Sequence, residues 1–128
     1  NIMVALNNFD EMVRESVKQK VDIIFAGAGL PLNLPQYTKG SSTKAVPIVS
    51  SGRAAGVICK SWDKHYGVCP DAIVVEGPLA GGHLGFTRDQ LFEPAFSLER
   101  LLIDVLEAVK PYEAKYDKRI PVIAAGGL

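Results

Sequence analysis

The chain has 128 residues, 48% of them hydrophobic and 22% charged, which is typical of one globular domain and excludes a disordered chain. Fourteen basic residues balance fourteen acidic ones, so we expect neither a nucleic-acid-binding surface nor one for anionic membranes. No apolar run approaches the ~20 residues of a membrane span, and no signal-peptide pattern is present, so we expect a cytoplasmic protein. Cys59 and Cys69 are too few for a disulfide scaffold and lack a metal-ligand spacing, so we interpret both as reduced thiols.

Five short apolar runs predict β-strands at residues 1–6, 22–26, 45–49, 72–75 and 120–124. The runs end in small or polar residues, and Gly-rich turns follow residues 22–26, 72–75 and 120–124. These three strands therefore lead into segments whose backbone is able to approach a ligand closely.

Helical periodicity fills most of the gaps between these strands. Asp10 is expected to cap a helix that runs to about residue 20, with a buried stripe of Met12, Val13 and Val17. Prolines and a Ser-Ser-Thr cluster allow at most one short helix within residues 30–44. A third helix is predicted at about residues 53–66, with an apolar face of Ala54, Ala55, Val57, Ile58 and Trp62.

The last predicted helix begins after Ser97, which is a suitable N-cap. Its apolar residues recur with helical spacing, and Pro111 is expected to disturb its end; these residues are Leu98, Leu101, Leu102, Val105, Leu106 and Val109. The segment before it, residues 84–96, is longer than a usual strand-to-helix connection and contains three Phe residues. It is therefore expected to form a lid or a wall of a binding site.

Alternating strands and helices predict a parallel α/β sheet, either an open doubly wound sheet or a (β/α)8 barrel. The barrel accounts for more of the sequence, because the polar and glycine-rich segments all follow strands, and barrel sites form at the carboxyl ends of the strands. A whole barrel needs ~250 residues, so residues 1–128 are expected to be a single-domain segment from the centre of a longer barrel.

The stretch from Asp71 to Gly85 is the strongest candidate for a functional site. A buried strand enters a loop that contains Gly77, Gly81, Gly82 and His83. The adjacent glycines allow close approach to an anion, and an imidazole beside them suits proton transfer near neutral pH. The simpler alternative stays open at this point: Gly81 and Gly82 form only a flexible turn and His83 is a solvated loop residue.

Four segments of the chain together resemble one enzyme family. They read N-I-M at residues 1–3, A-G-A-G at 26–29, E-G-P-L-A-G-G-H-L-G at 76–85 and I-P-V-I-A-A-G-G at 120–127. This pattern resembles the nitronate monooxygenases, formerly 2-nitropropane dioxygenases, which share an FMN-binding TIM barrel with flavin-dependent enoyl-acyl-carrier-protein reductases. The resemblance extends over essentially the whole chain.

The resemblance implies an FMN-dependent oxidoreductase that oxidises alkyl nitronates with O2. It implies that His83 is the catalytic residue, acting as a base on the nitroalkane carbon or stabilising the anionic nitronate. It places Asn1, Glu76, Gly81 and Gly82 near the flavin, and Gly126 with Gly127 at the start of a cradle for the FMN phosphate. The expected partners are small molecules, the nitronate and O2, with no bound metal; a homodimer is the assembly to test.

Two positions depart from the family pattern. Family members often have Gln where this chain has Glu76 and commonly Glu where it has Leu79, and Glu at the first of these positions also occurs in the enoyl reductases. A flavin-dependent enoyl reductase that uses NAD(P)H is therefore one alternative. A barrel that binds a phosphate ligand without redox chemistry is another.

Overall fold

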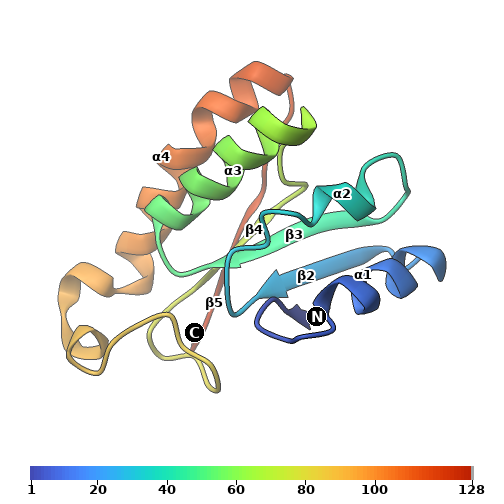
Figure 1. Cartoon of the computed structure of the whole chain (residues 1–128). Coiled ribbons are helices and arrows are strands. Elements are labelled where there is room, and N and C mark those ends of the chain that lie inside the picture. The colour runs from blue at the N-terminus through green and yellow to red at the C-terminus, as the bar shows by residue number, and fades with distance from the viewer. Residues whose placement is uncertain (128) are drawn as a thin grey trace.

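The computed structural model describes residues 1–127; Leu128 lies outside the described residues. Five strands alternate with helices along the chain (Figure 1): β1 (Ile2–Met3), α1 (Phe9–Lys18), β2 (Ile23–Gly27), α2 (Pro35–Thr38), β3 (Lys44–Val49), α3 (Gly52–Tyr66), β4 (Ile73–Glu76), α4 (Leu98–Tyr116) and β5 (Val122–Ala125). Two short 3-10 helices, Asp89–Phe92 and Pro94–Phe96, lie in the segment between β4 and α4.

The five strands form one parallel sheet in the order β1-β2-β3-β4-β5, so each strand pairs with its neighbour in sequence. The helices cover only one face of this sheet. Ile24, Val49, Ile73 and Val75 point to that face and join the helices in one buried core. A doubly wound sheet reverses its strand order and has helices on both faces. The architecture is therefore a partial segment of a (β/α)8 barrel, as the sequence predicts.

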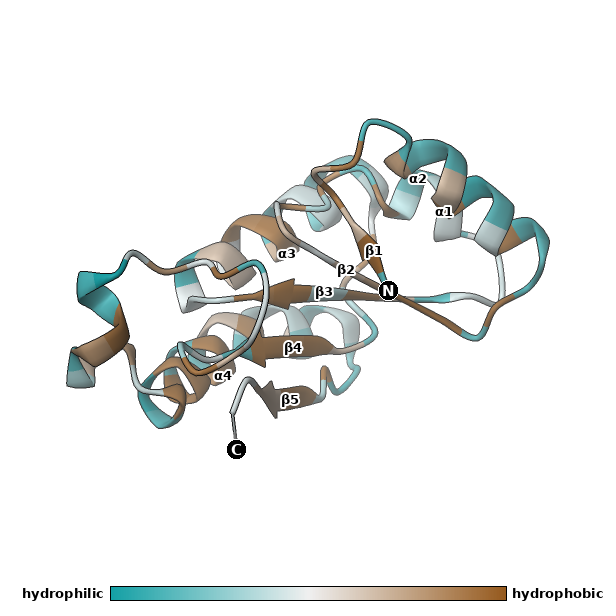
Figure 2. Cartoon of the chain, turned by 90° about the horizontal axis from the view of Figure 1, so that it is seen from below, coloured by the Kyte–Doolittle hydropathy of each residue, from teal (hydrophilic) through white to brown (hydrophobic). Residues whose placement is uncertain are grey.

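Side chains on the other face of the sheet point to what is the interior of a barrel. Met3, Ile23 and Ile123 alternate with the helix-facing residues and keep 40%, 44% and 44% of their surface exposed. Figure 2 shows that most of β4 and β5 and the carboxyl half of β3 are hydrophobic, whereas α1 is mostly hydrophilic. Strands that are apolar on both faces are typical of parallel sheets, which are normally covered on both sides.

Two helices begin at serine N-caps, of which Ser97 was predicted and Ser51 was not. Ser51 Oγ accepts a hydrogen bond from the backbone N of Ala54, and Ser97 Oγ accepts one from the backbone N of Arg100. Between these helices, Gly52 is required for packing, because a Cβ there would lie 2.7 Å from the backbone O of Asp104 in α4. The α3 and α4 helices accordingly lie side by side (Figure 1).

The predicted cap at Asp10 is wrong, and Pro111, which was expected to disturb the end of the last helix, lies inside α4. Asn8 occupies the cap position of α1, and Asp10 instead accepts a hydrogen bond from Asn33 Nδ2 at 3.0 Å. The α4 helix continues through Pro111 to Tyr116. Because Pro111 is on the exposed side of α4, water can bond to the backbone O that loses its helical partner.

Strand and stripe boundaries also differ from the prediction. The first strand covers two residues instead of six, because the chain turns away from the sheet after Val4 donates a hydrogen bond to Gly27 O. Met12, Val57 and Leu106 were expected in the core but are 38%, 41% and 42% exposed. Each of these residues lies at the edge of the apolar stripe of its helix, and the helix buries only the centre of that stripe. In α1, Phe9 is buried and Met12 is not.

Candidate active site

The carboxyl ends of the strands form the rim of a cavity of about 550 Å³. Because β2, β3 and β4 are parallel and in register, the segments that follow them meet at one edge of the sheet. The cavity is lined by residues 28–30 after β2, residues 48–51 at the end of β3, Glu76 at the end of β4, and residues 83–86 with Gln90 and Phe96 from the long connection. Its size suits a small organic ligand.

Glu76 is the last residue of β4 and is half-buried. Ile73 and Val75 of the same strand are fully buried against the helices, so strand alternation places Glu76 on the opposite face, toward the barrel interior. Glu76 lines the cavity together with His83. The structure therefore brings together the two ionisable residues that the sequence predicted for the site.

The loop that carries His83 is held over the end of β3 by a close contact. A Cβ on Gly85 would lie 2.5 Å from Ser50 Oγ, so only a glycine allows the loop to pack there. Gly82 has a φ of +82°, which a glycine adopts without strain. His83 is exposed at the rim of the cavity, whereas Gly81 and Gly82 are exposed and line none of the described cavities.

The long connection from β4 to α4 supplies an aromatic wall, as predicted for residues 84–96. The rings of Phe86 and Phe96 contact edge to face, with centroids 6.2 Å apart, and both residues line the cavity. Phe92 takes no part in this wall, because 85% of its surface is exposed.

Gly126 and Gly127 lie outside this cavity. They have φ values of +97° and +89°, and they pack against the loop after β4 so closely that a Cβ on Gly126 would lie 2.7 Å from Gly77 N. Both line a second cavity, of about 530 Å³, together with Leu79 and Phe92. Packing between the loop after β4 and the loop after β5 therefore accounts for the left-handed conformation of both glycines.

The fit of these residues to an FMN phosphate is partial. Two consecutive glycines beside a cavity leave backbone N–H groups accessible to an anion. However, the charged residues among the described lining of this second cavity are Glu93 and Glu99, which repel a dianion. The positive charge that a phosphate site needs is not among the described residues there.

Asn1 precedes β1 and is exposed. Ile2 is buried against the helices, so alternation places Asn1 on the open face of the sheet with Met3 and on the same side as Glu76. Asn1 lines none of the described cavities.

Sequence reasoning missed four polar residues that line the cavity: Ser50, Ser51, Arg53 and Gln90. The first three follow β3 directly. Their position after a strand could have indicated them, because barrel sites form at the carboxyl ends of the strands. This rule was applied to residues 76–83 and not to residues 50–53.

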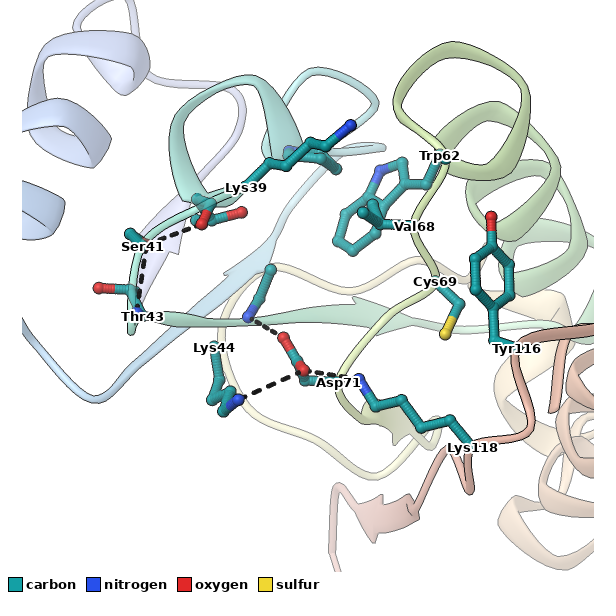
Figure 3. Close-up of a pocket in the computed structure, with 14 residues that line it drawn as sticks. Lys39, Ser41, Thr43, Lys44, Trp62, Val68, Cys69, Asp71, Tyr116 and Lys118 are labelled. Atoms are coloured by element: carbon teal, nitrogen blue, oxygen red, sulfur yellow. Dashed lines mark hydrogen bonds and ion pairs between the residues drawn. The ribbon is translucent and has the colours of Figure 1, made fainter.

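Another cavity, of about 270 Å³, lies at the opposite end of β3 and β4 and contains none of the predicted site residues (Figure 3). Asp71 is at its centre, where the carboxylate accepts hydrogen bonds from the backbone N of Ala45 at 2.9 Å and from Lys118 Nζ at 2.8 Å. Lys44 Nζ is 4.0 Å from the same carboxylate. These contacts join the amino ends of two strands to the loop before β5, which indicates a structural role.

Comparison with known proteins assigns the family. The family model described as nitronate monooxygenase matches residues 1–128, which is the whole chain. The chain belongs to the nitronate monooxygenase family. No curated protein matches the chain. Within residues 1–127 of this family member, no helix is long and apolar enough to cross a membrane.

Solved structures agree with this assignment. FabK from Thermotoga maritima is 28% identical to the chain, with a TM-score of 0.74, and the match covers 100% of this chain and 33% of FabK. Nitroalkane oxidase from Streptomyces ansochromogenes is 23% identical, with a TM-score of 0.68, and the match covers 94% of this chain and 31% of that enzyme. The second likeness shows the fold alone. The chain spans about a third of the length of either protein.

Proposed function

We propose that the protein is an FMN-dependent oxidoreductase that oxidises alkyl nitronates with O2. The observation that carries this proposal is that Glu76 and His83 line one cavity at the carboxyl ends of the strands, in a chain of the nitronate monooxygenase family. Family membership alone supports flavin-dependent oxidation, and the cavity supports a small-molecule substrate.

His83 is the residue we propose for proton transfer. Its imidazole lies at the rim of the cavity, where it can accept a proton from the carbon beside a nitro group or donate a hydrogen bond to a nitronate oxygen. Phe86 and Phe96 form an apolar part of the cavity wall, which suits the alkyl part of the substrate. A flavin bound at the open face would supply the electron transfer from substrate to O2.

The proposal is tested by the visible absorption spectrum of the protein at its full length, recorded without oxygen while the nitronate of 1-nitropropane is added. A flavin spectrum that bleaches and recovers in air supports the proposal. Chromatography of the released flavin beside FMN and FAD standards identifies the cofactor.

The other outcomes separate the alternatives. A bound flavin that ignores the nitronate but bleaches with NAD(P)H, and is reoxidised by an enoyl thioester, assigns the protein to the reductase alternative. Protein that contains no flavin and takes none up favours a barrel that binds a phosphate ligand without redox chemistry.

A further inference from the structure

Three lysines surround one carboxylate at the cavity of about 270 Å³ that lies at the amino ends of β3 and β4 (Figure 3). The lysines come from three segments of the chain: Lys39 directly follows α2, Lys44 begins β3, and Lys118 precedes β5. Asp71 is the one Asp or Glu in the described lining of this cavity. Three ammonium groups against one carboxylate leave the lining with an excess of two positive charges.

Asp71 neutralises only part of this charge. Its carboxylate accepts hydrogen bonds from the backbone N of Ala45 at 2.9 Å and from Lys118 Nζ at 2.8 Å. Lys44 Nζ is 4.0 Å from Asp71 Oδ1, which is too far for a hydrogen bond, so this pair leaves the N–H groups of Lys44 available to a ligand.

Lys39 has even less compensation. Within residues 1–127, no carboxylate forms an ion pair with its ammonium, which donates one hydrogen bond to the backbone O of Tyr66 at 2.6 Å. An ammonium has three hydrogens and no acceptor, so two of them are left for another group. The unpaired donors of the cavity are therefore cationic, and they suit an anion.

The turn from α2 to β3, which carries two of these lysines, is fixed by its own hydrogen bonds. Ser41 Oγ donates to Thr38 O at 2.7 Å and accepts from Thr43 N at 3.2 Å (Figure 3). The Thr43 side chain is buried and donates to Val21 O at 2.8 Å. Binding of a ligand at this turn therefore costs little ordering of the backbone.

We infer that this cavity binds a phosphate dianion, as inorganic phosphate or as the phosphoryl group of a small metabolite. A dianion matches the excess of two positive charges, and lysines bind phosphate as point charges. The volume of about 270 Å³ is below the roughly 300 Å³ at which pockets for larger organic ligands begin. The site lies at the opposite end of β3 and β4 from the proposed active site, so the inference does not depend on the function proposed above.

Calorimetric titration of inorganic phosphate into the protein at its full length, at pH 8 and about 0.15 M NaCl, tests the inference. This salt concentration screens weak interactions between exposed charges. We expect saturable binding that weakens about 5- to 10-fold in Lys39→Met and in Lys44→Met, because each substitution removes one charged hydrogen-bond donor. Lys60→Met, exposed on α3 and outside the cavity, should bind phosphate like the wild type. Lys118 stays unchanged in all variants because it pairs with Asp71.

Titration of glycerol 3-phosphate identifies the source of the phosphate. Tighter binding than that of inorganic phosphate assigns the site to a phosphomonoester, and weaker binding assigns it to free phosphate. Absence of binding for both compounds overturns the inference. Binding that neither Lys39→Met nor Lys44→Met weakens also overturns it, because the titrated phosphate then binds elsewhere on the protein.

Cys69 provides a second readout inside the cavity itself. Cys69 lines the cavity and is 8% exposed, whereas Cys59 is fully buried. Phosphate at about ten times its Kd should slow alkylation of Cys69 by the neutral reagent iodoacetamide about 10-fold, because only the unoccupied protein reacts. NaCl of the same ionic strength is the control. Equal alkylation rates in phosphate and in NaCl would overturn the inference even where calorimetry detects binding.

Discussion

Gly126 lies directly against Gly77, so closely that a Cβ on Gly126 would come within 2.7 Å of the Gly77 backbone N and 2.9 Å of its O. The Gly77 N also donates a hydrogen bond to Ala125 O at 2.9 Å. These contacts join the loop after β4 to the loop after β5, on which the proposed flavin site depends.

Replacing Gly126 by Ala is expected to destabilise the protein. The left-handed φ of +97° alone costs a residue with a Cβ roughly 1–3 kcal/mol, and the contact with Gly77 adds to this cost. Urea unfolding measures the change. Gly81→Ala is the matched control, because a Cβ there meets nothing within 4 Å, and its effect should stay within ~0.5 kcal/mol. Equal stability of the two variants would contradict the packing role of Gly126. Flavin loss in Gly126→Ala does not by itself assign phosphate binding to Gly126, because the substitution is expected to destabilise the protein.

Asp71 is expected to stabilise the amino end of the sheet. Its carboxylate, 26% exposed, binds the backbone N of Ala45 and the ammonium of Lys118 (Figure 3). Asp71→Asn removes the charge from both bonds, which should lower the free energy of unfolding by roughly 1–3 kcal/mol. Asp22→Asn, at an exposed carboxylate just before β2, should change it little. Similar urea midpoints for the two variants would show that the Asp71 contacts contribute nothing.

The fold was predictable because its signals are local and repeated. Alternation of apolar strands with periodic helices predicts parallel strands, and Ser97 caps α4 as its position before an apolar stripe indicates. The errors came from tertiary contacts. Asp10 bonds to Asn33, which is 23 residues away, so it does not serve as a local cap.

The candidate site was predictable only where its residues share one strand end. Glu76 and His83 are seven residues apart, and their common cavity follows from one strand and its loop. Arg53 lines the same cavity from the start of α3, and the pairing of Val49 with Val75 places the end of β3 beside the end of β4. The separation of Gly126 from that cavity depends on how two loops pack, which no local pattern contains.

Asp63 on α3 is expected to make stability depend on acidic pH. Its carboxylate accepts hydrogen bonds from Lys115 Nζ at 2.9 Å and from the Tyr116 hydroxyl at 2.5 Å, and these two bonds hold its pKa below the usual 3.8. Because the folded-state pKa is lowered, the stabilisation is present above about pH 3.8 and is lost as the pH falls through the folded value.

Unfolding by urea between pH 6 and pH 2 checks this prediction. Asp63→Asn should be less stable than the wild type at pH 6, and the difference should shrink toward pH 2. Asp89→Asn, in the exposed connection before α4, is the control. A difference that stays constant with pH would mean that the Asp63 charge has no part in the effect.

The two thiols should react slowly in the folded protein and at different rates. Cys59 is fully buried, and burial together with the neighbouring Cys69 raises the pKa of its thiol to about 12. Cys69 is 8% exposed, and burial raises its pKa as well. At pH 8, a thiol-specific reagent such as DTNB should therefore modify Cys69 first and Cys59 only on unfolding. The Cys69→Ser variant should lack the first of these two reactions, which shows which thiol reacts first. Rapid modification of both thiols in native protein would contradict the buried positions.

His83 should be needed for turnover and not for flavin binding. Its side chain lies at the rim of the cavity, and the glycine-rich loops, not the imidazole, are the proposed contacts to the cofactor. His83→Ala should lower kcat for nitronate oxidation by about 10²- to 10⁴-fold, the usual contribution of a general acid or base, while the flavin absorbance per protein stays the same. His65→Ala changes the other histidine, exposed near the end of α3, and should keep wild-type activity. Loss of flavin together with activity would assign His83 to cofactor binding, and unchanged kcat would show that it is a solvated loop residue.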